Sequence, residues 1–240
     1  MRCIKIQLAY DGGGFHGWQV QPGLPTIQGT LEEIVSAMEG SPVHVAGSGR
    51  TDAGVHALGQ IAAFTIANPI PLDNLRRALN RLLPPAIRVT AVEEVQAGFH
   101  PRFDAKAKTY EYRIVRGEIC SPFEWPYVYH YPYPLNEARM IQLARAFEGE
   151  HDFTPFAASD DRDAEGKSKV RTVFSSTLES ASGRMTYRVR GSGFLKHMVR
   201  NMAGTLIDAG RGNIGDLSSL PAKSGPTAPA KGLFLVSVEY

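Results

Sequence analysis

The chain has 240 residues, 43% of them apolar, which is enough for one large domain or two small ones around a substantial core and excludes a wholly disordered protein. Lys and Arg total 26 against 24 Asp and Glu, so the formal charge of +2 neither requires nor excludes a polyanionic partner. No stretch approaches the roughly 20 apolar residues of a membrane span, and the two distant cysteines match no disulfide or metal spacing, which is typical of a reducing compartment. We therefore expect a cytoplasmic protein.

The first half of the chain predicts the element order β-α-β-β-α-β. Residues 2–10 alternate apolar and polar side chains like a half-buried strand, a pattern that does not fit a secretory signal. Residues 27–38 carry apolar side chains at helical spacing, with two glutamates early in the helix. The other elements of this half are strands at 43–46 and 59–66, a helix with leucines at 72, 75, 79 and 82 and Asp73 near its start, and a strand near 87–95.

The second half repeats this order, although no repeat is visible in the residues themselves. Residues 107–116 predict a strand, and residues 136–147 predict a helix with Asn136 as its N-cap. The elements that follow are strands at 172–180 and 184–190 joined by a turn at Ser182-Gly183, a helix from about Phe194 to Ala209 that ends at Gly210, and a final strand at 233–240.

Two copies of the split βαβ pattern predict an α+β protein with two ferredoxin-like halves. We place the boundary near Ala105, so that the domains are residues 1–104 and 105–240. Their strands are expected to form one continuous, mostly antiparallel sheet with helices on one face. Residues 119–134, rich in proline and aromatics, and residues 157–169, rich in charge, are expected to be loops, the latter a mobile one on the surface.

Glycines 12, 14 and 17 satisfy the spacing G-x-G-x-x-G directly after a strand, which is the fingerprint of dinucleotide-binding proteins. That fingerprint needs a helix to begin at its third glycine, and Pro22 and Pro25 forbid a regular helix there. We therefore reject a dinucleotide site and expect these glycines to form tight turns. Trp18 beside them is expected to be a core or lid aromatic.

Asp52 lies in the stretch GRTDAGVHA at residues 49–57, which is too short and irregular to fill a core. An Asx-turn would explain an isolated aspartate in such a loop. Loops on rigid scaffolds also carry catalytic groups, however, and no Ser or Cys nearby offers a better nucleophile. A buried carboxylate needs a cation in order to stay ionised, and Arg200, at the edge of an apolar helix face, is a candidate partner for Asp52. A surface arginine whose aliphatic stem alone is buried remains the alternative for Arg200.

Local clusters of basic residues indicate a nucleic-acid partner more clearly than the net charge of the chain does. Residues 184–200 contain five Lys or Arg and no acidic residue, and residues 99–116 mix basic side chains with Phe and Tyr. Such mixtures suit phosphates and stacked bases, although solvated strand faces and strand propensity would also explain them. The histidines occur singly, without acidic or thiol partners at ligand spacing, so we expect no metal site.

The sequence closely resembles the tRNA pseudouridine synthase A family. The resemblance runs through the whole chain, and its motifs are highly specific when taken together. They are YDGGGFHGWQ at 10–19, TIQGTLE at 26–32, GRTDAGVHA at 49–57, FHPRF at 99–103, KTYEYRI at 108–114, RTV at 171–173, GSGFLKHMVRNMAG at 191–204 and GPTAPAKGLFLVSVEY at 225–240. Residues 211–224 look shorter than the segment usual in the family.

The resemblance implies the pseudouridine synthase fold and an isomerase that converts uridine to pseudouridine at positions 38, 39 and 40 of the tRNA anticodon stem-loop. It further implies a homodimer, no cofactor and base flipping. By position in the motifs, Asp52 matches the catalytic aspartate, Arg200 its partner, Tyr110 the residue that stacks on the target base, Arg50 the residue that fills the stack, and Leu233 a pocket-lining residue. The implied RNA contacts are Phe99, His100, Pro101, Arg102, Phe103 and Arg171.

Two other functions stay open on the residues alone. A non-catalytic RNA-binding protein would use the same basic clusters, and its binding would depend strongly on salt. A glycoside hydrolase would need a second carboxylate as an acid, which the motif-bearing stretches do not supply. The isomerase therefore ranks first and the hydrolase last.

Overall fold

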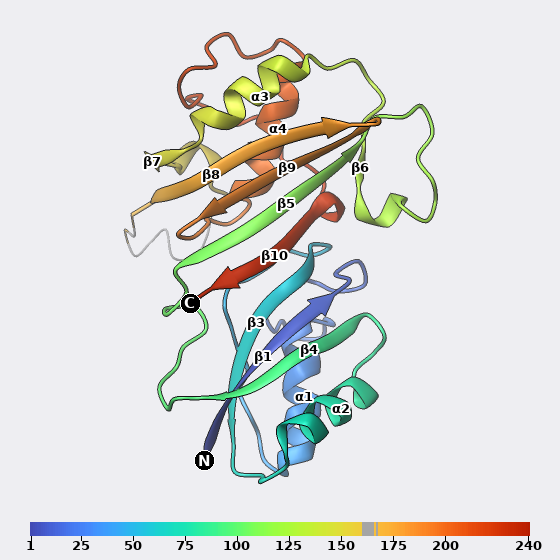
Figure 1. Cartoon of the computed structure of the whole chain (residues 1–240), viewed down its shortest axis with the longest axis vertical. Helices are drawn as coiled ribbons and strands as arrows, with labels where there is room; N and C mark the ends of the chain where they lie inside the picture. The colour runs from blue at the N-terminus through green and yellow to red at the C-terminus, as the bar shows by residue number, and fades with distance from the viewer. Residues whose placement is uncertain (160–165, 167) are drawn as a thin grey trace. The chain divides into compact units, whose positions relative to one another are not determined.

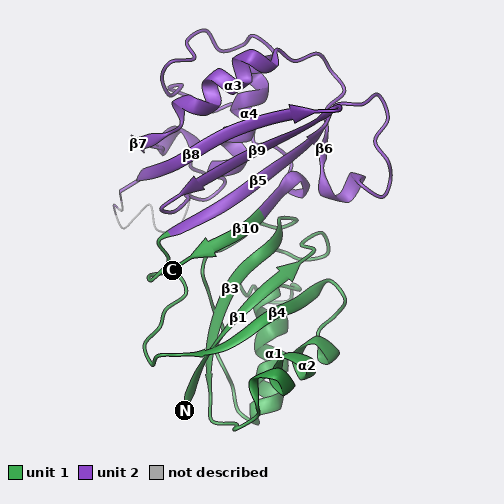
Figure 2. Ribbon diagram, viewed as in Figure 1, with its two compact units in different colours: residues 1–106, 235–240 green, residues 107–234 purple. Residues whose placement is uncertain are grey.

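The computed structural model describes residues 1–159, 166 and 168–240 of the chain, and these residues divide into two compact units (Figure 2). Unit 1 comprises Met1–Lys106 and Leu235–Tyr240, and unit 2 comprises Ala107–Phe234. The last six residues thus belong with the first unit, whereas the sequence pattern groups them with the second half. Most of the charged loop predicted at 157–169 lies outside the described residues.

Unit 1 is built around strand β1 (Arg2–Tyr10), which pairs antiparallel with β3 (His56–Ile66) on one side and with β4 (Ile87–Val95) on the other. The strand order is β4-β1-β3-β10, where β10 spans Leu233–Glu239, and the short β2 (Ala46–Gly47) also pairs with β3. From Ile4 to Tyr10 the even-numbered residues of β1 are buried and the odd-numbered ones are partly or fully exposed, which confirms the alternation predicted for residues 2–10.

Two helices pack on one face of this sheet, α1 (Ile27–Glu39) and α2 (Leu72–Leu82) (Figure 1). Thr26 caps the first turn of α1, because its side chain accepts a hydrogen bond from a main-chain amide of that turn, and Gly40 ends the helix at a φ of 78°. The apolar stripe of α1 includes the fully buried Leu31, and burial of such a side chain contributes about 2 kcal/mol to folding.

The strands of unit 2 continue the strand order of the sheet as β5-β9-β8-β7 and pair antiparallel. The longest pairings are those of β5 with β9 and of β9 with β8, and the latter two form a hairpin that turns at Ser182 and Gly183, both with positive φ. A short parallel strand, β6, flanks β5. The strand bounds are Ala107–Val115 for β5, Tyr129–His130 for β6, Gly149–Asp152 for β7, Val170–Ala181 for β8 and Arg184–Gly191 for β9.

Helices α3 (Glu137–Ala146) and α4 (Met198–Gly210) pack against the unit 2 sheet and against each other. Asn136 caps α3 as predicted, since its side chain accepts a hydrogen bond from the Arg139 amide. Tyr187 of β9 is fully buried beneath these helices. Short 3₁₀ turns occupy Trp125–Tyr127, Thr154–Phe156 and Ala230–Gly232.

The α+β class and the mostly antiparallel strand pairing are confirmed, but some predicted element bounds are wrong. Helix α4 begins at Met198 and not near Phe194, because His197 adopts a φ of 61° that no α-helix contains. Strand β2 has only two residues, and the short strands β6 and β7 were not predicted. Among the described residues, no helix is both long and apolar enough to cross a membrane.

Candidate active site

Asp52 lies in the irregular loop between β2 and β3 and is half-buried. Its carbonyl accepts a hydrogen bond from the Val55 amide at 3.1 Å, and Gly54 completes the turn with a φ of 76°. Because only glycine adopts this φ without strain, the GRTDAG motif needs its second glycine for the shape of the turn. The loop therefore exposes part of the carboxylate while its main chain follows a fixed path.

A buried polar network supports the loop from below. Tyr10 Oη lies 2.9 Å from Thr51 Oγ1, and the side chain of Gln60 donates to the Gly49 carbonyl at 3.0 Å and accepts from Ser48 Oγ at 2.6 Å. Burial raises the pKa of Tyr10 to about 12, so its hydroxyl stays protonated at neutral pH. Each of these groups would cost free energy if it were left unpaired, so the network favours one conformation of residues 48–51.

The glycine-rich stretch after β1 lies directly against this loop. An added Cβ on Gly12 would stand 2.0 Å from the Val55 carbonyl oxygen, and one on Gly17 would stand 2.6 Å from that of Thr51. The Gly12 amide also donates to Nδ1 of the buried His56 at 3.1 Å. These glycines therefore serve close packing of two loops within unit 1, in agreement with the rejection of a dinucleotide site.

The FHPRF motif of unit 1 divides into an anchored part and an exposed part. The Phe99 ring packs on Tyr240 with centroids 5.1 Å apart, the Lys5 ammonium lies over both rings, and Tyr240 Oη donates to the Pro101 carbonyl at 2.7 Å. Phe103, in contrast, is 75% exposed. The remaining residues of the motif are a half-buried His100, whose Nδ1 accepts from the main-chain amides of the next turn, and an exposed Arg102.

Tyr110 stands on β5 of unit 2, where it pairs with Val189 and is 7% exposed. Phe194 meets its ring edge-on, with centroids 5.2 Å apart. Leu233 is also buried, at the start of β10. Tyr110 and Leu233 thus lie where rigid elements fix their side chains.

Arg200 lies in the first turn of α4 and is half-buried. A cation at this end of a helix is disfavoured by the helix dipole, so the position does not serve helix stability. Its Nε donates to the Ala228 carbonyl at 2.8 Å, and its own carbonyl accepts from the Ala228 amide at 3.2 Å. The first contact orients the guanidinium, and the second holds the main chain of Ala228 against α4.

Arg171 lies near the start of β8 in unit 2. Its guanidinium donates to the carbonyls of Ser168 and Val170 at 2.9 and 2.6 Å, so these hydrogen bonds hold it against its own strand. It is half-buried, and its contact with RNA stays a prediction.

The basic run 184–200 does not form a single patch. Along β9 the arginines at 184, 188 and 190 point to the face opposite Tyr187 and Val189, as strand alternation requires. Glu111 pairs with Arg188 and also with Arg113, at 3.1 Å from the latter, and Glu124 pairs with Arg184. Acidic neighbours from other segments therefore neutralise part of a run that contains no acid in sequence.

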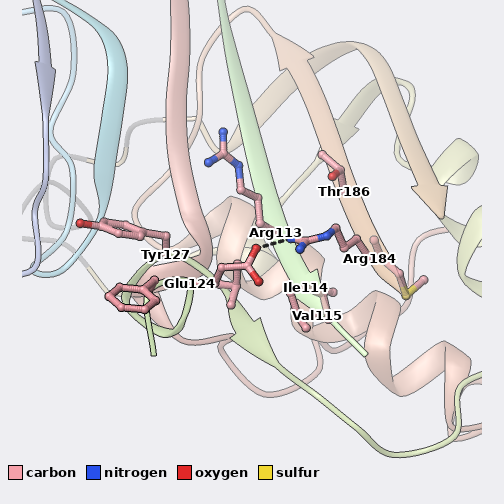
Figure 3. Close-up of a pocket in the computed structure, with 10 residues that line it drawn as sticks. Arg113, Ile114, Val115, Glu124, Tyr127, Arg184 and Thr186 are labelled. Carbon is pink, nitrogen blue, oxygen red and sulfur yellow. Dashed lines mark hydrogen bonds and ion pairs between the residues drawn. The ribbon is translucent and has the colours of Figure 1, made fainter. Parts of the chain in front are cut away.

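The same face holds a pocket of about 400 Å³, shown in Figure 3. The Glu124–Arg184 pair crosses it, and the Arg113 guanidinium stacks 3.8 Å from the centroid of the Phe234 ring. None of the predicted site residues lines it. The lining residues are Arg113, Ile114, Val115, Phe123, Glu124, Tyr127, Val128, Arg184, Met185 and Thr186.

The predicted site residues fall in both units: Asp52 and Arg50 in unit 1, and Tyr110, Arg200 and Leu233 in unit 2. Arg50 is exposed on the Asp52 loop. The pairing of Asp52 with Arg200 would join residues of different units, and it stays a prediction.

Sequence reasoning did not single out the groups that support these residues. Phe194 beside Tyr110 could have been suspected as the aromatic in GSGFLK, but the Ala228 carbonyl that binds Arg200 is a main-chain atom and leaves no trace in the sequence.

Comparisons with known proteins agree with the motifs. The family model described as tRNA pseudouridine synthase matches residues 7–104 and 143–240, which include Asp52 and Arg200 but not Tyr110. A tRNA pseudouridine synthase A of Solibacter usitatus is 80% identical over 240 residues and the full length of both chains. Those of Brevibacillus brevis and Lacticaseibacillus casei are each 42% identical, again over the full length of both chains. The chain therefore belongs to the tRNA pseudouridine synthase A family.

Proposed function

We propose that this chain converts uridine to pseudouridine at positions 38, 39 and 40 of the tRNA anticodon stem-loop, with Asp52 as the catalytic carboxylate and without a cofactor. The observation that carries the proposal is the Asp52 loop, in which a motif of the family holds a half-buried carboxylate above a buried polar network. Such a network has the rigidity that a catalytic group needs.

The chemistry explains why one fixed carboxylate would suffice. The glycosidic bond from uracil N1 to the sugar must break, the uracil must rotate, and C5 must then bond to the same sugar carbon. The hydrogen on C5 leaves as a proton and N1 gains one, so the product is an isomer of the substrate. Asp52 would act either on the uracil ring or on the sugar carbon, and the proposal includes both routes. The target base must also leave the RNA stack to reach the carboxylate, so base flipping is part of the proposal.

The other residues receive roles from their surroundings. Arg200, held by the Ala228 carbonyl, would pair with Asp52 and keep it ionised. Tyr110, braced by Phe194, would stack on the uracil while it rotates. Leu233 would line the pocket, and the exposed Arg50 would fill the space that the flipped base leaves.

We assign RNA contact within FHPRF chiefly to its exposed side chains. Arg102 and Phe103 would meet phosphate and base, and His100 would support their turn. Phe99 and Pro101 would act by holding the motif on Tyr240. Arg171 would add a contact from the edge of unit 2.

The proposal includes a cytoplasmic homodimer with a tRNA that crosses both subunits. Within each chain, residues 1–104 would contribute the carboxylate, and residues 105–240 would contribute the stacking tyrosine and the arginine. Sedimentation tests the dimer directly: a monomer at working concentration would remove it from the proposal without affecting the chemistry.

The positions are tested by incubating an unmodified tRNA transcript with the protein and mapping pseudouridine by carbodiimide adduct formation and primer extension. We expect primer-extension stops that report positions 38, 39 and 40 when these are uridine. Transcripts with cytidine at each position in turn are the matched controls. Pseudouridine elsewhere would contradict the assigned positions, and tRNA binding without any product would favour the RNA-binding alternative.

A further inference from the structure

A segment of unit 2, residues 225–232, runs along α4 and is hydrogen-bonded to it at three successive points. We call it the clamp segment. The Gly225 amide donates to Thr205 Oγ1 at 2.8 Å, and Thr227 Oγ1 lies 2.6 Å from Asn201 Oδ1. The third contact joins the Ala228 amide to the Arg200 carbonyl. The contacts follow the helix from Thr205 back to Arg200, so they fix the position of the segment along the helix axis.

The clamp segment approaches α4 more closely than any side chain would allow. An added Cβ on Gly204 would lie 1.7 Å from the Pro226 carbonyl oxygen, and one on Gly225 would lie 2.9 Å from the Gly204 carbonyl oxygen. The two glycines therefore bring main chain against main chain, a contact with no flexible side chain that could shift.

Asn201 is the side chain that ties this segment to the rest of the unit. It is 6% exposed, its Nδ2 donates to the Phe156 carbonyl at 2.7 Å, and its Oδ1 is the partner of the Thr227 hydroxyl. Since Nδ2 faces a carbonyl, Oδ1 must accept and Thr227 must donate. Only a side-chain amide can donate on one side and accept on the other at this length, so neither Leu nor Asp would replace it.

The clamp segment also contacts Arg200 and the neighbour of Tyr110 on β5, Tyr112. In its middle, the Ala228 carbonyl receives Arg200 Nε at 2.8 Å. Near its far end, the Pro229 carbonyl accepts a hydrogen bond from Tyr112 Oη at 2.8 Å, and Gly232 lies against the Tyr112 ring. Strand β10 begins at the next residue, Leu233. Burial raises the pKa of Tyr112 well above its usual range, which keeps this hydroxyl a donor.

We propose that Asn201 and Thr227 are positioning residues, which set the orientation of the Arg200 guanidinium through the Ala228 carbonyl. Asn201 is buried and Thr227 is exposed, and the role proposed for both acts through their hydrogen bond and not through contact with RNA. A guanidinium is planar, so a hydrogen bond at Nε sets the plane of the whole fork and the direction in which it meets a carboxylate. The inference rests on the proposed function, because it assigns Arg200 the role of partner to Asp52.

The test compares two substitutions of the same residue. Thr227→Val keeps the shape of the side chain and removes the donor, whereas Thr227→Ser keeps the donor and removes a methyl group. We expect the single-turnover rate to fall about tenfold in Thr227→Val with an unchanged Kd for tRNA, and to stay near that of the parent in Thr227→Ser. Thr177→Val, on an exposed position of β8, is the matched control and should leave the rate unchanged.

A role in packing alone would reverse this order, because the serine variant loses the methyl group and the valine variant does not. A double-mutant cycle adds a second readout. In an Arg200→Lys background, which has no planar fork to orient, Thr227→Val should lower the rate less than twofold further. Full additivity, or a parental rate in Thr227→Val, would overturn the inference.

The same assays separate this inference from the proposed function. If the parent protein forms no pseudouridine, the proposed function fails. If the parent is active and Arg200→Lys is slow but Thr227→Val is not, only the positioning role fails. Asn201→Ser would remove the buried side-chain amide, and we expect this variant protein to unfold at a lower temperature. The test therefore uses the two Thr227 variants and not a variant of Asn201.

Discussion

The two regions that carry the candidate catalytic groups fix them by different means. Asp52 lies on a loop, and side chains from two strands hold that loop through the buried Thr51–Tyr10–Gln60–Ser48 network. Arg200 lies on a helix, which already sets its Cα, and a main-chain carbonyl sets its side chain. A loop residue needs its backbone held, whereas a long side chain on a helix needs its far end held. Glycines permit close packing of main chain in both regions.

The largest effect should come from breaking the close packing in unit 1. In Gly12→Ala the new methyl group would overlap the Val55 carbonyl, so we expect a loss of about 3 kcal/mol in the free energy of unfolding and little remaining activity. Gly14→Ala is the control, because no atom lies within 4 Å of the position its Cβ would take. Urea unfolding and rate measurements on both variants check this. Equal stability of the two would show that the loops do not pack as described.

Removing one hydroxyl from the network should have a smaller, more selective effect. Tyr10→Phe leaves the Thr51 hydroxyl without its aromatic partner, so we expect unfolding to become easier by about 1 kcal/mol and the single-turnover rate to fall several-fold. The Kd for tRNA should not change. Tyr133→Phe, at an exposed tyrosine, should alter neither quantity. A Tyr10→Phe protein with the parental rate would mean that the network supports folding but not the position of Asp52.

The smallest expected change, a loss of tRNA binding alone, distinguishes the exposed part of FHPRF from the anchored part. Phe103→Ala should weaken tRNA binding by about 1 kcal/mol, the lower range for a stacked base, and leave stability unchanged. Phe99→Ala should instead lower the free energy of unfolding by about 2 kcal/mol, because it removes the ring packed on Tyr240. Filter binding and urea titration of both variants measure the difference. Reversed effects would mean that the wrong half of the motif was assigned to RNA.

Much of the fold followed from local patterns. The alternation in β1, the leucine spacing of α2 and the Asn136 cap of α3 each act within a few residues, and the structure confirms all three. The start of α4 was wrong because one left-handed residue, His197, interrupts a continuous apolar pattern. The short strands β6 and β7 depend on partners far away in the chain, and no local pattern marks them.

In the candidate site too, features set by local motifs could be predicted and features set by distant partners could not. Motifs marked Asp52, Tyr110 and Arg200 as candidates, because the proposed chemistry would belong to their side chains. The supports were not predicted, since Tyr10 and Gln60 meet across 50 residues and the Ala228 carbonyl has no side-chain signature. Candidate residues that lie in motifs are therefore easier to find in a sequence than the groups that contact them.

The central claim is that Asp52 catalyses the isomerisation, and release of tritium from C5-labelled uridine in unmodified tRNA tests it most directly. The hydrogen on C5 leaves only when C5 bonds to the sugar. With no metal or nucleotide added, we expect release by the parent protein and a loss of at least about a thousandfold in Asp52→Asn, with tRNA affinity retained. Release by the Asp52→Asn variant at the parental rate would contradict the account.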